Sequence, residues 1–148
     1  MGFSFNADLQ KAYEVEQEVI QMYIASGYTA TSTYHLEVFA GYDIIVENHA
    51  TIEVKNQAAT EVTDNVAVEL YKVIDGVKYK SGLTATTADF HVYKILGKFY
   101  IITTDKLKAL LKRLKSNNAL PIIKGGDNNS TCMALVSKYV FRKECQLL

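Results

Sequence analysis

Residues 42–55 read Tyr-Asp-Ile-Ile-Val-Glu-Asn-His-Ala-Thr-Ile-Glu-Val-Lys and contain two short strand-like runs, 42–46 and 52–55. In a strand, residues i and i+2 point to the same side. Glu53 and Lys55 are therefore expected to project together from one face, while the apolar residues beside them project from the other. This stretch therefore predicts a strand with charged side chains on one face of the sheet and buried apolar side chains on the other.

The two runs can also bring a second carboxylate to the same place. If they form an antiparallel hairpin centred on Asn48, Asp43 falls directly opposite Glu53. Opposed side chains in such a ladder lie about 4.5–5.5 Å apart at Cβ, which is close enough to hold one divalent cation. Two carboxylates at that distance need a counter-charge, which a metal ion and Lys55 would supply. The sequence therefore predicts a metal site.

The pattern Asp43…Glu53-Val54-Lys55 resembles the signature of the PD-(D/E)XK nuclease superfamily, which includes restriction enzymes and Holliday-junction resolvases. Tyr42 stands where the signature has proline. The resemblance implies a restriction-endonuclease-like α/β fold, with a mixed β-sheet core flanked by helices. It also implies hydrolysis of DNA phosphodiester bonds that leaves a 5′-phosphate.

The first helix is expected over residues 7–26, with Asp8 just inside its start and Gly27 as its C-terminal stop. Glu16 falls within its apolar stripe, and Glu14 and Glu18 face away. A desolvated carboxylate costs several kcal/mol unless it is paired, neutralised or metal-bound. The stripe is formed by Leu9, Tyr13, Ile20, Tyr23 and Ile24.

The resemblance gives Glu16 a role, because many nucleases of this superfamily place a glutamate of the first helix at the metal site. There, too, it precedes a helix-ending glycine by about three turns, as Glu16 precedes Gly27. The alternative is a glutamate at the edge of the stripe whose carboxylate reaches solvent or pairs with a lysine.

Residues 63–70 and 81–90 are similar to a run in small phage-encoded members of the superfamily, Thr-Gly-Asn-x-x-x-Glu followed by Ser-Gly-x-x-x-Thr-x-Ala-Asp-aromatic. Asp64 replaces the glycine, which puts the local turn in question. Glu69 is either an accessory metal ligand or a structural partner. Asp89 is expected to cap or hydrogen-bond the entry to a strand.

Length and composition indicate one domain over residues 1–148. No apolar run approaches the ~20 residues that cross a bilayer, and the N-terminus lacks a signal-peptide profile. Two cysteines make no disulfide framework, so reduced thiols and a cytoplasmic location are expected. The formal net charge of zero predicts weak, salt-sensitive DNA binding, although residues 105–124 contain six basic residues and one acidic residue.

The remaining elements follow from periodicity and turn residues. A helix capped by Thr104 or Asp105 is expected to run through Lys115. Strands are expected over 28–39, 66–74, 90–96, 99–103, 120–123 and 134–141, with a turn at Gly97-Lys98 and a loop or short helical turn over 82–88.

The predicted mechanism uses Asp43, Glu53 and the main-chain carbonyl of Val54 to hold Mg²⁺ or Mn²⁺ through oxygen ligands. Glu16 would bind the same ion through water or help to hold a second. Lys55 would orient the attacking water and offset the charge on the phosphorus centre. Gln57 would position water or a phosphate, or is a plain exposed polar residue.

DNA, branched or duplex, is the expected partner, and a homodimer is expected because resolvases cut two strands symmetrically. A catalytically silent DNA-binding or assembly module on the same fold is the alternative. The three histidines lack zinc-site spacing and no Walker loop is present, which disfavours other classes of metal enzyme and nucleotide hydrolase.

Overall fold

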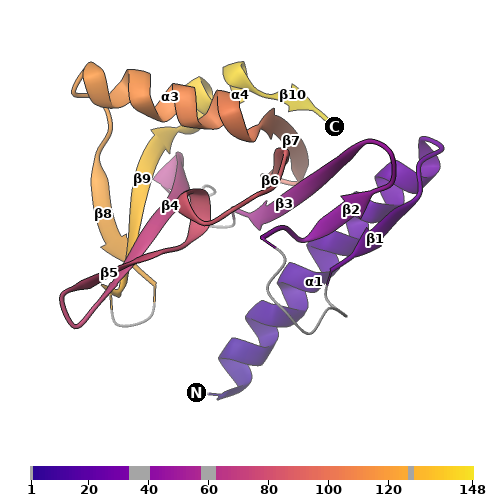
Figure 1. The fold of residues 1–148 in the computed structure, drawn as a ribbon, viewed down its shortest axis with the longest axis horizontal. Helices are drawn as coiled ribbons and strands as arrows, with labels where there is room; N and C mark the ends of the chain where they lie inside the picture. Colours follow the sequence, from indigo (N-terminus) through magenta and orange to yellow (C-terminus); the bar gives the residue numbers. More distant parts are fainter. Residues whose placement is uncertain (1, 34–40, 58–62, 127–128) are drawn as a thin grey trace.

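The computed structural model describes residues 2–33, 41–57, 63–126 and 129–148, with side chains from residue 9 onward. Its helices are α1 (Gly2–Ala25), the 3₁₀ helix η1 (Gly82–Thr84), α3 (Thr104–Ser116) and α4 (Lys138–Glu144). Its strands are β1 (Ala30–Ser32), β2 (Ile44–Val46), β3 (Ala50–Asn56), β4 (Asn65–Ile74), β5 (Val77–Lys80), β6 (Phe90–Ile95), β7 (Lys98–Thr103), β8 (Ile122–Gly125), β9 (Thr131–Ser137) and β10 (Gln146–Leu147). Figure 1 shows their arrangement.

The strands form two sheets. A six-stranded sheet has the order β1-β2-β3-β6-β7-β10, and a four-stranded sheet has the order β5-β4-β9-β8. In the larger sheet only the β3–β6 pair is parallel, so the sheet is mixed, as the sequence predicts. The second sheet was not foreseen as separate, because hydrophobic pattern identifies strands but not their partners.

The β2–β3 hairpin has the predicted register. Ile44 pairs with Ile52 and Val46 with Ala50, which centres the turn on Asn48. Asn48 has a φ of 55°, a left-handed conformation that asparagine adopts more readily than most residues. The side chain of Ile52 is fully buried, whereas Glu53 faces the opposite side, as expected.

Helix α1 covers one face of the six-stranded sheet (Figure 1), and its packed face includes Ile20 and Tyr23 of the predicted stripe but not the whole stripe. The helix begins at Gly2 rather than near Ala7. Leu9 and Ile24 are 54% and 45% exposed, so they do not belong to the buried stripe. The core is formed instead by Val15, Val19, Ile20 and Tyr23 against Ile44, Val46, Ile52, Val92 and Phe99. Apolar residues lie on more than one side of this helix, so periodicity alone does not select the packed one.

A second core lies between the other face of the large sheet, the small sheet and the two C-terminal helices. Leu107, Leu110 and Leu111 of α3 are buried there, as their spacing predicts. They pack with Val66, Val68, Tyr93, Ile95, Tyr100, Ile102, Ala134, Val136 and Phe141. The ring of Tyr93 meets that of Phe141 edge to face, with centroids 4.8 Å apart.

Two predicted elements need correction and one lies partly outside the description. The strand expected over 134–141 ends at Ser137, whose hydroxyl accepts a hydrogen bond from the Tyr139 amide and so starts α4. Thr103, not Thr104 or Asp105, caps α3 by accepting from the Lys106 amide. Of the strand expected over 28–39, β1 forms residues 30–32, and residues 34–40 lie outside the described part of the chain.

No helix in the described ranges combines the length and apolar character that a bilayer crossing requires.

Candidate functional site

The main chain of the β2–β3 hairpin fixes the Asp43 carboxylate. Asp43 lies one residue before β2, and its amide donates to the Ile52 carbonyl at 2.9 Å. Its Oδ2 accepts a hydrogen bond from the Val54 amide at 2.8 Å. The carboxylate is therefore tied to the strand that carries Glu53 and Lys55, which is the juxtaposition that the sequence predicts.

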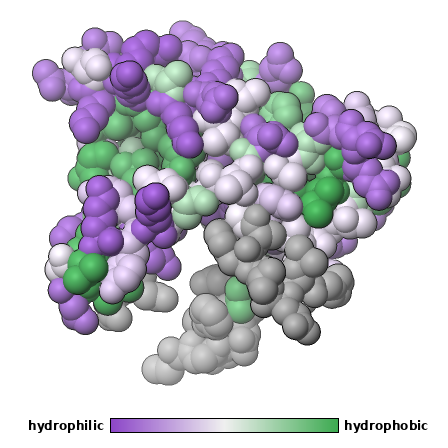
Figure 2. Space-filling model, viewed as in Figure 1, coloured by the Kyte–Doolittle hydropathy of each residue, from purple (hydrophilic) through white to green (hydrophobic). Residues whose placement is uncertain are grey.

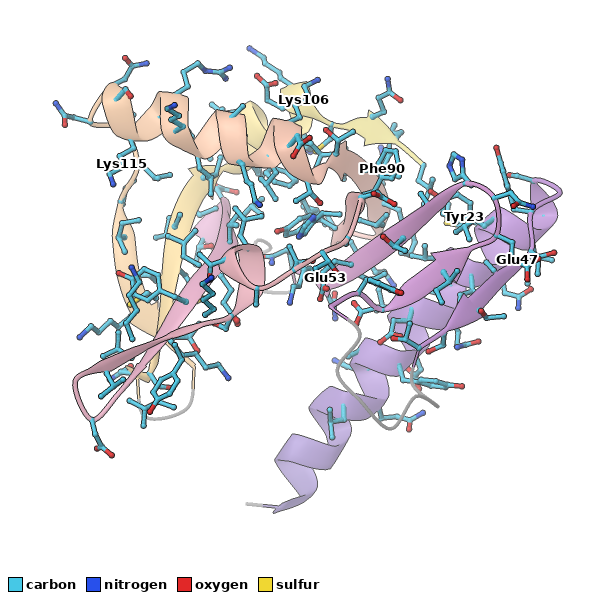
Figure 3. The ribbon with its side chains drawn as sticks, in the orientation of Figure 1. Tyr23, Glu47, Glu53, Phe90, Lys106 and Lys115 are labelled. Carbon is cyan, nitrogen blue, oxygen red and sulfur yellow. The ribbon has the colours of Figure 1, made fainter. Side chains whose placement is uncertain are left out.

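Glu53 lies between the two sheets (Figure 3), with a side chain that is 19% exposed. Burial and, after it, the neighbouring charge of Asp43 raise its pKa to about 7, while Lys55 acts in the opposite direction. The ammonium of Lys55 lies 3.5 Å from Oε1 of Glu53. Glu53 thus has both the Asp43 carboxylate and the Lys55 ammonium as neighbours, and the three side chains form one charged group.

Glu16 reaches the same neighbourhood from α1. It is half-buried, and its Oε1 accepts a hydrogen bond from the Ser32 hydroxyl at 3.4 Å. Burial and, after it, the charge of Asp43 raise its pKa to about 7. Glu16 is therefore within electrostatic reach of Asp43. By contrast, Glu18 lies on an exposed side of α1, where its carboxylate pairs with the ammonium of Lys94 from β6.

A cavity of about 310 Å³ opens beside Glu53 and Lys55. Its other lining residues come from β4, β5 and the segment around η1, and they are Glu69, Lys80, Ser81, Gly82, Ala85 and Thr86. Glu69 thus shares a cavity with the candidate centre, as one of its two predicted roles requires. Lys80 was not anticipated, because no local pattern sets it apart from the other surface lysines of the chain.

The structure explains why glycine follows Ser81 at position 82. Its φ is 50°, and a Cβ there would lie 2.3 Å from the Glu69 carbonyl oxygen. The close approach lets η1 pack on β4, where the Thr84 hydroxyl donates to the Leu70 carbonyl at 2.7 Å. Glycine is required both for the backbone conformation and for the contact.

Asp64 and Asp89 also have structural explanations. Asp64 has a φ of 59°, so it occupies a left-handed position where the resembling sequences have glycine. Asp89 holds the entry to β6, because its Oδ2 accepts from both the amide and the hydroxyl of Thr51, at 2.9 and 3.1 Å. The predicted cap-like role of Asp89 is present in the structure.

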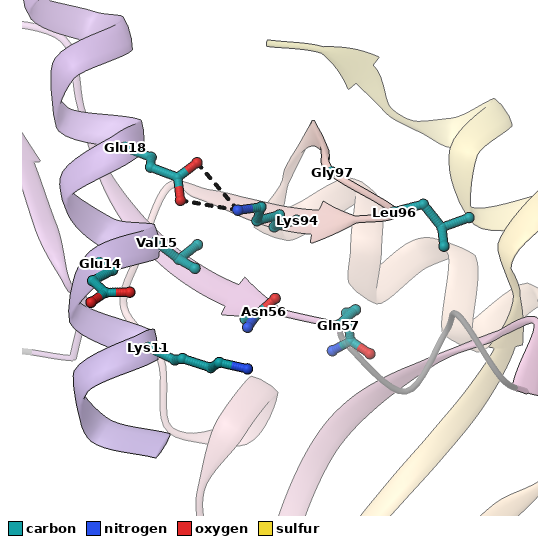
Figure 4. Close-up of a pocket in the computed structure, with 9 residues that line it drawn as sticks. All are labelled: Lys11, Glu14, Val15, Glu18, Asn56, Gln57, Lys94, Leu96 and Gly97. Carbon is teal, nitrogen blue, oxygen red and sulfur yellow. Dashed lines mark hydrogen bonds and ion pairs between the residues drawn. The ribbon is translucent and has the colours of Figure 1, made fainter. Parts of the chain in front are cut away.

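Gln57 lies apart from this group. Its amide nitrogen donates to the Ala67 carbonyl at 3.0 Å and its amide oxygen accepts from the Ala67 amide at 3.1 Å. The side chain thereby joins the end of β3 to β4 of the other sheet. It also lines a polar cavity of about 290 Å³ between α1 and the ends of β3 and β6, where Glu18 pairs with Lys94 (Figure 4).

His91 sits beside Glu53 in the parallel β3–β6 ladder. Its Nδ1 lies 2.9 Å from the Thr104 hydroxyl oxygen, and that hydroxyl donates to the Ala88 carbonyl at 2.6 Å. The hydroxyl proton is thus already engaged, so Nδ1 of His91 is the donor and carries the proton. Burial lowers the pKa of His91 to about 4, which keeps the ring neutral.

The donor chemistry fits a hard divalent cation in part. Asp43 and Glu53 supply adjacent carboxylate oxygens, the ligand type that Mg²⁺ and Mn²⁺ prefer. The raised pKa values of Glu53 and Glu16 record an excess of buried negative charge that a cation would relieve. Within the described ranges, however, no group of three or more histidine, cysteine, aspartate or glutamate side chains is arranged to hold a metal ion.

The fold is similar to that of a bacterial homing endonuclease, I-Ssp6803I. The two structures superpose with a TM-score of 0.51 over 65% of this chain and 68% of that one, at 19% sequence identity. The mixed sheet with flanking helices is therefore a fold that a nuclease uses. The sequence matches no family model and no curated protein.

Proposed function

We propose that this protein is a divalent-metal-dependent DNA endonuclease of the PD-(D/E)XK type. The observation that carries the proposal is the contact of Asp43, Glu53 and Lys55 on neighbouring strands, with Glu16 within electrostatic reach. The similarity in fold to a homing endonuclease supports it. The proposed unit is a single nuclease domain over residues 1–148.

Asp43 and Glu53 would hold Mg²⁺ or Mn²⁺, with the main-chain carbonyl of Val54 as a further oxygen ligand and Glu16 acting through water. When bound, the metal supplies charge neutralisation at the phosphoryl oxygen and a lower pKa for the attacking water. Lys55, which is 34% exposed, can donate to that water and offset negative charge in the transition state. Asp43 keeps its orientation through the Val54 amide.

The proposed substrate is duplex or branched DNA, and a Holliday-junction resolvase acting as a homodimer is one form of the proposal. One observation favours a second function, a DNA-binding module without catalysis. It is the absence, among the described side chains, of a third carboxylate arranged with Asp43 and Glu53.

Cleavage of supercoiled plasmid and of a labelled four-way junction tests the proposal. Reactions with Mg²⁺ or Mn²⁺ are compared with reactions in EDTA. We expect metal-dependent cutting that Lys55→Ala abolishes and that Lys98→Ala, a change at an exposed lysine on β7, leaves intact. Equal cutting by wild type and Lys55→Ala would indicate a contaminating nuclease. No cutting of either substrate by folded wild-type protein would favour the silent module.

A further inference from the structure

A larger hollow, of about 740 Å³, lies between α3 and the four-stranded sheet. Figure 2 shows apolar surface there, framed by hydrophilic side chains. We call it the lysine groove, and its lining comes from α3, β4, β5, η1, the start of β8 and the segment between α3 and β8. The lining residues are Leu70, Tyr71, Lys78, Leu83, Lys108, Leu111, Lys112, Lys115, Asn118, Leu120, Pro121 and Ile122.

The charges of the groove are all of one sign. Lys108, Lys112 and Lys115 are spaced i, i+4 and i+7, so they follow one side of α3. Lys78 joins them from β5, with its ammonium 4.0 Å from the centroid of the Tyr71 ring. Among the described residues that line the groove, none is acidic. Such a surface is complementary to a polyanion.

The other basic residues of α3 make a contrast. Arg113 pairs with Glu144 at 2.8 Å, and Lys106 lies 3.9 Å from the same carboxylate. These two residues help to dock α4 and lie away from the groove. Lys106 and Lys115 lie at opposite ends of the helix (Figure 3). The helix therefore divides its basic residues between a side that pairs with Glu144 of α4 and a side that lines the groove.

The floor of the groove identifies which polyanion fits. Leucine, proline and isoleucine side chains cover it, together with the Tyr71 ring. A DNA duplex presents phosphates outward and keeps its bases stacked inside, so it would leave such a floor uncovered. A single strand presents phosphates and base faces together, and lysines with apolar or aromatic side chains match that combination.

The groove lies next to the candidate metal centre. Glu69 and Gly82 line the cavity beside Glu53, whereas the next residues, Leu70 and Leu83, line the groove. A β-bulge between Glu69 and Tyr71 turns both Leu70 and Tyr71 towards the groove. One wall, made by β4 and η1, therefore separates the two hollows by the thickness of a strand.

We propose that the lysine groove binds an unpaired single-stranded segment of DNA that adjoins the duplex at the metal centre. The inference rests on the proposed nuclease function and names its substrate class, a duplex with a single-stranded branch or overhang. Lys78, Lys108, Lys112 and Lys115 contact the phosphates of the unpaired strand. Its bases lie against the apolar floor.

Fluorescence anisotropy in EDTA, where no cutting occurs, tests the inference. Three labelled probes are compared: a blunt duplex, the same duplex with a single-stranded overhang, and the single strand alone. Wild-type protein is expected to bind the overhang probe about tenfold more tightly than the blunt one. The double variant Lys112→Ala/Lys115→Ala is expected to lose this preference. Its salt dependence on the single strand should fall in slope by about 1.4, at roughly 0.7 per phosphate contact.

The matched control is Lys98→Ala/Lys143→Ala, which removes the same charge from exposed lysines outside the groove. It should keep the overhang preference. Equal wild-type affinity for the blunt and overhang probes would overturn the inference. A loss of affinity in Lys112→Ala/Lys115→Ala that is the same for all three probes would also overturn it. Cutting of DNA without an overhang preference would reject single-strand binding by the groove and leave the proposed nuclease function in place. A preference without cutting in Mg²⁺ would reject the nuclease and keep the groove.

Discussion

The candidate metal centre and the lysine groove lie on two sides of one wall, and they handle charge in opposite ways. The centre holds the carboxylates of Glu16 and Glu53 partly buried, with raised pKa values, while a strand amide fixes the carboxylate of Asp43. The groove holds its lysines on an exposed helix side. Buried like charges destabilise a fold, whereas exposed charges cost little because water and salt screen them.

This difference shows what a net charge of zero conceals. Residues 1–54 contain eight acidic residues and one basic residue, so the remaining chain carries the compensating positive charge. The sum over the chain disfavours a nucleic-acid enzyme, but its distribution places an acidic centre beside a basic groove. For association with DNA, the local field is what matters.

The largest expected effect is at Glu53. Glu53→Gln should lower metal-dependent cleavage at least about 10³-fold, because it removes one of two adjacent carboxylate ligands. The same change should raise the melting temperature of the metal-free protein at pH 8, because it removes a desolvated charge beside Asp43. Cleavage assays and thermal unfolding measure the two effects.

The control for Glu53 is Glu47→Gln, an exposed glutamate on the same hairpin (Figure 3), which should change neither quantity. If Glu53→Gln cut DNA at the wild-type rate, the centre would lie elsewhere in the chain.

The next largest effect is expected in the wall of β4 and η1 that separates the two regions. Gly82→Ala should destabilise the fold by about 3 kcal/mol, because its Cβ meets the Glu69 carbonyl at 2.3 Å and the backbone is left-handed. Gly97→Ala shares the positive φ, at 78°, but has no atom within 4 Å. It should cost about 1 kcal/mol. Urea unfolding compares the two, and equal losses would mean that the contact with β4 has no effect.

A substitution at Gln57 tests whether this residue belongs to the catalytic group. Gln57→Ala should destabilise by about 2 kcal/mol, because the amide and carbonyl of Ala67 lose their partners. Cleavage per folded molecule should change less than about threefold. Asn56→Ala, at the exposed neighbouring position, serves as the control. A large loss of cleavage at unchanged stability would instead support the water-positioning role predicted from the sequence.

The smallest effect is in the pH dependence of stability. Glu16 and Glu53 have folded-state pKa values near 7 against an ordinary 4.5, so the folded state holds protons that the unfolded state has released. Stability should therefore fall as pH rises through this window. The lowered pKa of His91 acts in the opposite direction, but only between about 4 and 6.5.

Between pH 6.5 and 8 the carboxylates act alone, and metal-free protein should lose about 1 kcal/mol over that range. Millimolar Mg²⁺ should reverse this loss of stability at pH 8. It should have little effect at pH 5, where protons compete for the same carboxylate oxygens. Calorimetry with and without the metal measures both. A flat profile that Mg²⁺ leaves unchanged would contradict the arrangement of carboxylates described above.

What the sequence predicted well was local. The β2–β3 register follows from alternation and a turn-forming Asn48, and the buried face of α3 follows from its leucine spacing. Asp43, Glu53 and Lys55 were brought together because a hairpin sets their relation within thirteen residues. These features depend on neighbours along the chain.

What the sequence did not predict depends on distant partners. The packed face of α1 is chosen by the sheet beneath it, and several sides of the helix are apolar enough to serve. The role of Gln57 is set by Ala67 of the other sheet, and the groove needs β5 to approach α3. No pattern of apolar and polar residues encodes which sheet a strand will join.

The parallel pairing of β3 with β6 has a consequence for how the molecule comes into being. Between these strands the chain makes β4, β5 and η1, and β4 pairs both with β5, which follows it directly, and with the distant β9. Contacts of such sequence separation form late, since the loop must close before the pairing contributes any stability. A nascent chain that has not yet made β9 therefore lacks one of the two strands that hold β4 in place. The wall beside Glu53 is completed only after residues 131–137 have been made, although Glu53 itself lies far earlier in the chain.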